Sequence, residues 1–225
     1  MKIALFTLCK DRFAYTKRTF QSLAKKTHIP YDHFVIDQGS KDKTIEWLNQ
    51  FTYKQGKVYV YPLAMNIGIN RGVNFAIDRI GEKYDAVVKM DNDVEIETDG
   101  WLEKCLKVLR PKLLLSPYIK GLIDNRGGVN RIGFDNNAIG YTSFIGGICM
   151  IGLRRAWKED SGGWEFPVPK HAGGDLAFCK KLTLTGYRFG YKENVIIKHL
   201  ETTAGQFERY PDYFKERKQE RTKVF

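Results

Sequence analysis

Two carboxylates spaced one residue apart, Asp91 and Asp93, are the side chains of this sequence best suited to chemistry. They follow 86–90, a short and mostly apolar run that predicts a strand buried on both faces. In open α/β sheets, ligands bind at the carboxyl ends of the strands. Two hard oxygen ligands placed there can hold Mg²⁺ or Mn²⁺, and the ion can in turn hold a phosphate. Taken alone, the pattern also fits an ordinary polar turn after a strand.

The segment that leads to this pair alternates between predicted strands and predicted helices. Strands are predicted at 2–9, 33–37, 58–61 and 86–90, and helices at 13–27 and around 45–51. A third helix is predicted after the turn at 66–70, with Val73, Ala76, Ile77 and Ile80 on its inner face. Ser40 or Asp42 can cap the second of these helices. This alternation predicts an α/β fold with a mostly parallel, doubly wound sheet flanked by helices.

Beyond Gly100 the pattern becomes mixed. It predicts a helix that ends before Pro111, a strand at 113–116, a Gly- and Asn-rich loop at 121–140 that has room for a hairpin, a helix from Asp175 to about 185, and a last strand at 195–197 that leads to His199. We see no repeat and no separable linker.

The composition is that of a globular protein, with 225 residues of which 43% are hydrophobic and 13% aromatic. The four cysteines lie far apart without a C-x-x-C pair, so we expect reduced thiols in a cytoplasmic protein. The apolar N-terminal run is too short for a signal peptide, and no run reaches transmembrane length. A net charge of +11 favours anionic partners. The basic run 215–223 fits either a solvated helix or a weak contact with an acidic membrane surface.

The loop after the first predicted strand, 7–12, contains no glycine. This excludes the G-x-G-x-x-G turn of dinucleotide-binding sites and the P-loop, since both need glycine for the backbone to approach phosphate. A metal at Asp91 and Asp93 then remains as the means of neutralising a diphosphate.

Four motifs, in this order, resemble those of family 2 glycosyltransferases of the GT-A fold. They are 34–44 (FVIDQGSKDKT), 66–68 (NIG) with Asn74 beyond it, 90–93 (MDND), and the set formed by 145–150, 162–164, 174–178 and 186–188. The resemblance spans about 2–199. It implies a single GT-A domain over 1–205, with a nucleotide-sugar-binding half (1–97), a smaller, mixed acceptor-binding and catalytic half (98–205), and a basic tail (206–225).

The resemblance also implies which residues bind the donor. The expected nucleotide-sugar contacts are Thr7, Lys10, Arg12, Asp37, Asn66, Asn70, Asp91 and Asn92. Asp93 and His199 are the expected ligands of Mn²⁺ or Mg²⁺, with diphosphate oxygens and waters completing the shell. Arg12 equally fits a surface residue, and Asp37, Asn66 and Asn70 also fit caps, although for Asp37 we favour the nucleotide contact.

On the acceptor side the resemblance implies that Asp175 is the catalytic base. An inverting transfer needs a carboxylate that takes the proton of the acceptor hydroxyl. The family usually has two acidic residues here, whereas this chain has Gly174-Asp175, which puts acceptor contacts in question; Asp175 also fits a helix cap. Trp164 and His171 are expected to contact the acceptor, although Trp164 equally fits the core.

The resulting hypothesis is a metal-dependent inverting glycosyltransferase. It would move a sugar from a nucleoside diphosphate sugar, UDP favoured with GDP and dTDP open, to a hydroxyl of a glycan or glycolipid, in the cytoplasm or at a membrane periphery. A sugar-phosphate nucleotidyltransferase should carry a glycine-rich loop after the first strand, which is missing. A non-catalytic nucleotide-sugar-binding module stays open. A nucleic-acid binder should cluster basic and aromatic residues; we see no such cluster outside the tail, so we expect no nucleic acid.

Overall fold

The computed structural model describes residues 1–121, 131–164, 173–201, 205 and 208. The strands within these residues form one ten-stranded sheet in the order β3-β2-β1-β4-β9-β6-β10-β8-β7, with β5 paired to β10 off this path. Their bounds are β1 (Ile3–Cys9), β2 (Asp32–Asp37), β3 (Val58–Pro62), β4 (Ala86–Met90), β5 (Val94–Ile96), β6 (Leu113–Lys120), β7 (Gly133–Phe134), β8 (Ile139–Thr142), β9 (Cys149–Leu153) and β10 (Arg188–His199).

Two directions of pairing divide this sheet. Strands β3, β2, β1 and β4 are parallel to one another, whereas β9 runs antiparallel to β4 and β6. Beyond β9, β6 and β10 are parallel, and β5, β8 and β7 add antiparallel pairs. The carboxyl ends of β1, β2 and β4 therefore share one edge, and the antiparallel β9 delivers its preceding loop to the same edge.

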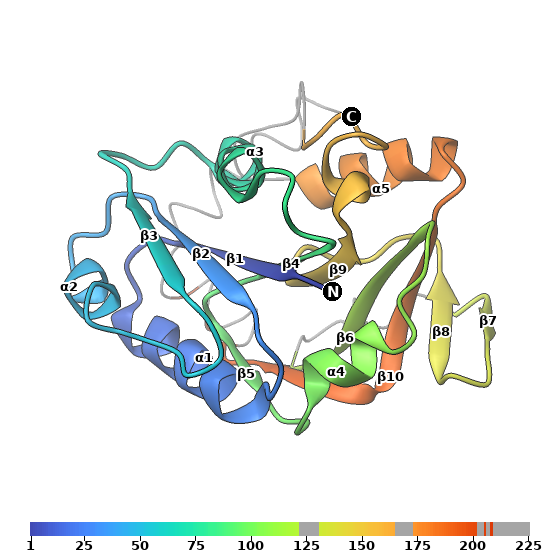
Figure 1. Cartoon of the computed structure of the whole chain (residues 1–225), viewed down its shortest axis with the longest axis horizontal. Coiled ribbons are helices and arrows are strands. Elements are labelled where there is room, and N and C mark those ends of the chain that lie inside the picture. Colours follow the sequence, from blue (N-terminus) through green and yellow to red (C-terminus); the bar gives the residue numbers. More distant parts are fainter. Residues whose placement is uncertain (122–130, 165–172, 202–204, 206–207, 209–225) are drawn as a thin grey trace.

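Helices cover both faces of the sheet (Figure 1). They are α1 (Phe13–Lys26), α2 (Thr44–Leu48), α3 (Ile69–Ile80), α4 (Trp101–Leu106) and α5 (Gly174–Leu184), with a 3₁₀ turn, η2 (Arg154–Trp157). Side chains of α1, α2 and α4 share one hydrophobic core with one face, and those of α3, α5 and η2 share a second core with the other. This two-sided burial explains the near-continuous apolar runs of β1, β2 and β4.

Strand β5 follows the carboxylate pair and was not predicted. Thr19 of α1 both donates to the Val94 carbonyl (2.7 Å) and accepts from its amide (3.0 Å), which holds β5 beneath α1. On its other side β5 pairs with β10, with His199 opposite Val94. A three-residue strand thus joins the end of the last strand to the loop after β4.

Other boundaries differ where polar residues obscured the pattern. The last strand covers Arg188–His199 rather than 195–197, because a register shift between Lys192 and Ile196 lets it pair on through its polar stretch. Strand β6 extends to Lys120, and the helix expected around 45–51 ends at Leu48. The segment expected as a loop at 121–140 includes β7 and the start of β8, which pair as a hairpin and extend to Thr142.

All four cysteines are buried free thiols. Among the described residues, no helix has both the length and the apolar character to cross a membrane. Residues 206–225, the predicted tail, lie outside the described residues apart from Glu208.

Candidate functional site

The loops that follow β1 and β2 are bonded to each other at the shared edge. The amide of Asp11 donates to Ser40 Oγ (2.7 Å), and the amide of Lys41 donates back to Asp11 Oδ1 (2.6 Å). Asp42 accepts from the first amide of α1, at Phe13 (2.8 Å), and from the Thr44 amide (2.9 Å), so it serves both helix starts. The polar motif after β2 therefore fixes the conformation of the loop after β1.

That loop carries backbone strain. Asp11 and Arg12 have φ of 53° and 63°, a left-handed conformation that costs non-glycine residues about 1–3 kcal/mol each. The turn aims the Arg12 side chain at Asp93, with Nη1 2.7 Å from Oδ2. Both side chains are largely buried, 22% and 8% exposed. Strain of this kind is retained where it serves a site, and here it places a permanent cation beside the second carboxylate of the D-x-D pair.

The other oxygen of Asp93 faces His199. His199 Nε2 lies 3.5 Å from Asp93 Oδ1, and the amide that follows His199, at Leu200, donates to the Asp93 carbonyl (2.8 Å). The pairing of β10 with β5 produces this approach. Both residues expected to bind metal are thus brought together from positions 106 residues apart, as their numbers show (199 − 93).

His199 and Asp93 can supply two ligands of a divalent cation. His199 Nδ1 lies 2.6 Å from the Glu201 carbonyl and 3.4 Å from the Glu201 amide, so the protein holds that side of the ring and Nε2 is the nitrogen that faces Asp93. An imidazole nitrogen and a carboxylate oxygen suit Mn²⁺ or Mg²⁺. Within the described part of the chain, no three His, Cys, Asp or Glu side chains gather as a metal site. Phosphate oxygens and waters must supply the rest of the shell.

Asp91 is bound to a buried lysine. Lys89 Nζ lies 2.5 Å from Asp91 Oδ1, and the Asp91 side chain is 38% exposed. Desolvation raises the pKa of the Asp91 carboxyl against the opposing effect of the Lys89 ammonium, and Asp93 adds to the rise. One side of this carboxylate is held by the protein and the other side faces the edge.

Asp37, at the end of β2, has one unsatisfied oxygen. Oδ2 accepts from the Ser40 amide (3.0 Å), whereas Oδ1 is buried without a hydrogen-bond partner. Among the described residues no donor reaches this oxygen, so it is the part of Asp37 that can accept a hydrogen bond from another molecule.

Asp175 lies in the first turn of α5. Its Oδ2 accepts from the Gly147 amide (3.1 Å) and its Oδ1 from the Leu176 amide (2.9 Å). Each oxygen keeps a second lone pair. Gly147 precedes β9, which is paired with β4, so the carboxylate of α5 is tied to the loop beside the D-x-D pair.

The start of α5 also packs against the donor half. A Cβ on Gly174 would come within 2.0 Å of Asn70 Oδ1 and 3.0 Å of the Trp164 ring, so a larger residue here would displace the Asn70 side chain and press on Trp164. This contact gives a physical reason for glycine at the position where the resemblance led us to expect a second acidic residue. Asn70, from α3, is buried at this contact.

The remaining predicted residues lie in different surroundings. Thr7 has no exposed surface, and its hydroxyl lies 2.9 Å from His33 Nε2. Burial lowers the pKa of His33 to about 3. Thr7 therefore lies in the core rather than on a pocket wall. Asn92 donates to Thr16 of α1 (2.9 Å) and is 9% exposed. Trp164 is 2% exposed and packs on Phe178, so stacking on a sugar would require it to be uncovered.

Two further predicted donor contacts bond to nearby loops. Lys10 Nζ donates to the Gly39 carbonyl (2.6 Å) and pairs with Asp11 (2.9 Å). Asn66 Oδ1 accepts from the Gly68 amide (2.8 Å) and so shapes the turn before α3. His171 lies outside the described residues.

Sequence reasoning missed Lys89 and Gln38. Gln38 Oε1 accepts from the Ile67 amide (3.2 Å) and ties the loop after β2 to the turn before α3. A lysine inside an otherwise apolar strand, two residues before a carboxylate, was the available signal for Lys89.

Comparison with known proteins finds a match to one family model. Residues 5–114 match the family model described as glycosyl transferase family 2. The matched segment contains the loops after β1 and β2 and the D-x-D pair, so the first half of the chain is similar to this family. No curated protein sequence matches the chain.

Solved structures show the same fold at low identity. S. aureus TarS 1-349 in complex with UDP-GlcNAc matches with a TM-score of 0.66 and 16% identity, over 90% of this chain and 59% of that one. The mannosyltransferase PcManGT from Pyrobaculum calidifontis, in complex with GDP-Man and Mn²⁺, matches with a TM-score of 0.72 and 15% identity, over 97% of this chain and 61% of that one. GalNAc-T7 with UDP, GalNAc and Mn²⁺ matches with a TM-score of 0.68 and 13% identity, over 88% of this chain and 44% of that one. The fold is that of GT-A glycosyltransferases, and the chain spans about three fifths or less of the length of these three proteins.

Proposed function

We propose that the protein is a metal-dependent, inverting glycosyltransferase. It transfers a sugar from a nucleoside diphosphate sugar, with UDP favoured, to a hydroxyl of a glycan or glycolipid. The observation that carries the proposal is the arrangement at one sheet edge: Asp37, Asp91 and Asp93 follow parallel strands of the family segment, and Asp175 is bonded to the loop beside them.

On the donor side, residues 1–97 bind the nucleotide. The unpaired Asp37 Oδ1 accepts a hydrogen bond from the base or the ribose, and the exposed side of Asp91 accepts one from the ribose. Arg12, held in position by its strained turn, contributes positive charge next to the diphosphate. Residues 98–205 form the acceptor side.

Asp93 and His199 would hold the cation through Oδ1 and Nε2. When bound, Mn²⁺ or Mg²⁺ stabilises negative charge on the leaving diphosphate. Two of the compared structures contain Mn²⁺ with their nucleotide ligands, which supports the choice of cation.

Asp175 takes the proton of the acceptor hydroxyl. The hydroxyl oxygen then attacks the anomeric carbon from the side opposite the leaving diphosphate, so that the configuration inverts. The bonds from the Gly147 and Leu176 amides fix the carboxylate and leave a lone pair on each oxygen for the proton.

The nucleotide base is the least constrained part of the proposal. UDP accompanies TarS and GalNAc-T7, and GDP-Man accompanies PcManGT. UDP is therefore the first donor base to test, with GDP second.

The test compares Asp175→Asn with the wild type on a panel of UDP-glucose, UDP-GlcNAc, UDP-galactose and GDP-mannose with Mn²⁺. Release of the nucleoside diphosphate, with and without a mixed glycan acceptor, measures turnover, and calorimetry measures binding. We expect turnover to fall by about 10²–10⁴-fold, the usual contribution of a general base, with the dissociation constant nearly unchanged. Asp78→Asn, an exposed carboxylate paired with Lys158, is the matched control and should keep wild-type turnover.

Two other outcomes are decisive. Wild-type turnover in Asp175→Asn would show that another group is the base. Tight nucleotide binding by the wild type without turnover on any donor and acceptor would favour a non-catalytic nucleotide-sugar-binding module.

A further inference from the structure

A lysine, Lys89, is the fourth of the five residues of β4, the strand that leads to the D-x-D pair. All five residues of β4 are buried, and the Lys89 side chain is 4% exposed. It lies on the same face as Val87, which belongs to the core under α3 and α5. Removing an ammonium from water costs several kcal/mol unless it is paired, and an aliphatic side chain would fill this position without that cost.

The ammonium has three neighbours from different parts of the chain. It lies 2.5 Å from Asp91 Oδ1, it donates to the Gly147 carbonyl, and it sits 6.0 Å from the centre of the Trp164 ring. Asp91 belongs to the donor side and Gly147 to the loop before β9. Lys89 is therefore a buried charged contact between the D-x-D pair and that loop.

Gly147 is held from both sides. Lys89 binds its carbonyl, and Asp175 accepts from its amide (3.1 Å). The residue after Gly147 adds a second contact with the D-x-D pair, since the Asp91 amide donates to the Ile148 carbonyl (2.9 Å). A continuous series of contacts thus runs from Asp91 through Lys89 and Gly147 to Asp175.

We infer that Lys89 is a positioning residue that sets the placement of the Asp175 carboxylate relative to a donor bound at Asp91. The inference rests on the proposed function. Lys89 reaches Asp175 only through the Gly147 backbone, so its role is to hold that backbone and one oxygen of Asp91 in a fixed relation.

Lys89→Met tests this role, because methionine keeps the length and loses the ammonium. The Gly147 carbonyl would lose its donor, and the loop that carries the Asp175 contact could shift. A misplacement of about 1 Å can cost about 10²-fold in rate. We therefore expect turnover to fall by about 10²-fold while the dissociation constant for UDP with Mn²⁺ changes by less than about threefold, the pattern of an interaction that acts on the transition state.

Lys192→Met is the matched control. Lys192 is also a buried strand lysine, 6% exposed, and it also donates to a backbone carbonyl, that of Asn137. It lies in β10 beside the β8 hairpin and has no contact with Asp91, Gly147 or Asp175 among the described residues. We expect Lys192→Met to lose comparable stability in thermal unfolding and to keep wild-type turnover.

A spectroscopic measurement on the wild type keeps the test independent of variant folding. In a ¹⁵N-glycine spectrum, the Gly147 signal is identified by its loss in Gly147→Ala. Adding UDP with Mg²⁺ should shift this signal, because the donor side is coupled to Gly147 through Lys89. In Lys89→Met, UDP should bind and the shift should largely disappear.

The outcomes separate the inference from the function on which it rests. Wild-type turnover in Lys89→Met, an equal loss in Lys192→Met, or UDP binding that leaves the wild-type Gly147 signal unmoved would overturn the inference alone. Absence of nucleoside diphosphate binding by the wild type would overturn the proposed function and the inference with it.

Discussion

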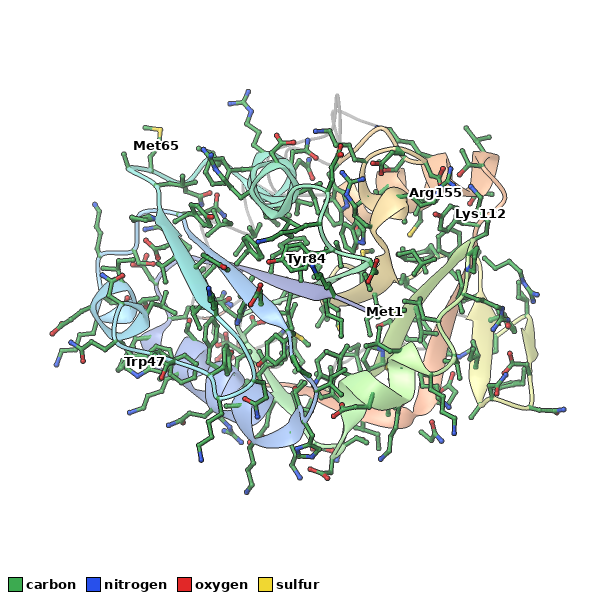
Figure 2. The ribbon with its side chains drawn as sticks, in the orientation of Figure 1. Met1, Trp47, Met65, Tyr84, Lys112 and Arg155 are labelled. Atoms are coloured by element: carbon green, nitrogen blue, oxygen red, sulfur yellow. The ribbon has the colours of Figure 1, made fainter. Side chains whose placement is uncertain are left out.

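Asp160 is the most densely bonded carboxylate among the described residues, and its loss has a calculable effect on stability. It accepts from Lys112 (3.0 Å), from Arg155 through two nitrogens (3.0 and 2.9 Å) and from the Tyr187 hydroxyl (2.7 Å). Figure 2 shows Lys112 and Arg155 next to each other at one end of the molecule. These bonds join the start of β6, η2 and the turn before β10.

The bonds make folding dependent on the charge of Asp160. Burial raises its pKa, but hydrogen bonds from Arg155, Tyr187 and Lys112 outweigh that effect and lower the pKa to about 2. An unfolded Asp titrates near 3.9, so the shift of about two units corresponds to at most about 2.6 kcal/mol. The partners are 40% and 63% exposed, so solvent screening reduces this to about 1–2 kcal/mol.

The perturbation is Asp160→Asn, measured by urea unfolding between pH 7 and pH 2. Because the folded pKa is depressed, the stabilisation is fully present above about pH 4 and is lost as the pH falls through about 2. We expect the variant to be about 1–2 kcal/mol less stable at pH 7, and the gap to close toward pH 2. Asp78→Asn removes an exposed pair and should change stability by less than about 0.5 kcal/mol. A stability gap for Asp160→Asn that does not vary with pH would show that the charge of Asp160 does not supply this stabilisation.

Two glycines of the site give opposite predictions. Gly174→Ala should destabilise the protein by about 2–3 kcal/mol, because its Cβ would overlap Asn70 and press on Trp164; thermal unfolding measures this, and Asn70→Ala in the same chain should recover part of the loss. Gly147→Ala should change stability by less than about 1 kcal/mol, since its Cβ meets Asp175 and Trp164 at 3.5–3.7 Å, ordinary contact distances. Equal effects of the two substitutions would contradict the packing described at the start of α5.

The strands and helices of the first half follow from hydrophobic patterning. Strands β1, β2 and β4 are apolar runs bounded by polar residues, which is what burial on both faces requires. The bounds of β10 were harder to predict from the sequence, because this strand contains the polar residues Lys192, Glu193 and Asn194. Its pairing with β6 and β8, which makes the strand continuous, is not visible in the local sequence. Strand β5 has three residues, too few for a periodic signal.

Some residues of the site could be found from the sequence, whereas others depend on how the strands pair. Motif spacing selected Asp37, Asp91 and Asp93, whose surroundings suit a ligand. Thr7 was chosen because it ends a strand, yet period-two alternation puts it on the same face as Leu5 and Cys9, under α1. Contacts such as Lys89 with Gly147 depend on the pairing of β4 with β9, which local sequence does not specify.

A thermal-shift panel measures whether Asp93 takes part in metal-dependent nucleotide binding, as proposed. UDP, GDP, dTDP and CDP are each added with and without Mn²⁺ to the wild type, Asp93→Ala and the control Asp78→Ala. A nucleotide at about 100 times its dissociation constant adds about 2.7 kcal/mol, which is a shift of about 5–10 °C for a protein of this size. We predict such a shift for UDP, only with Mn²⁺, retained in Asp78→Ala and lost in Asp93→Ala. No shift with any nucleotide, or a shift that Asp93→Ala retains, would contradict this proposal.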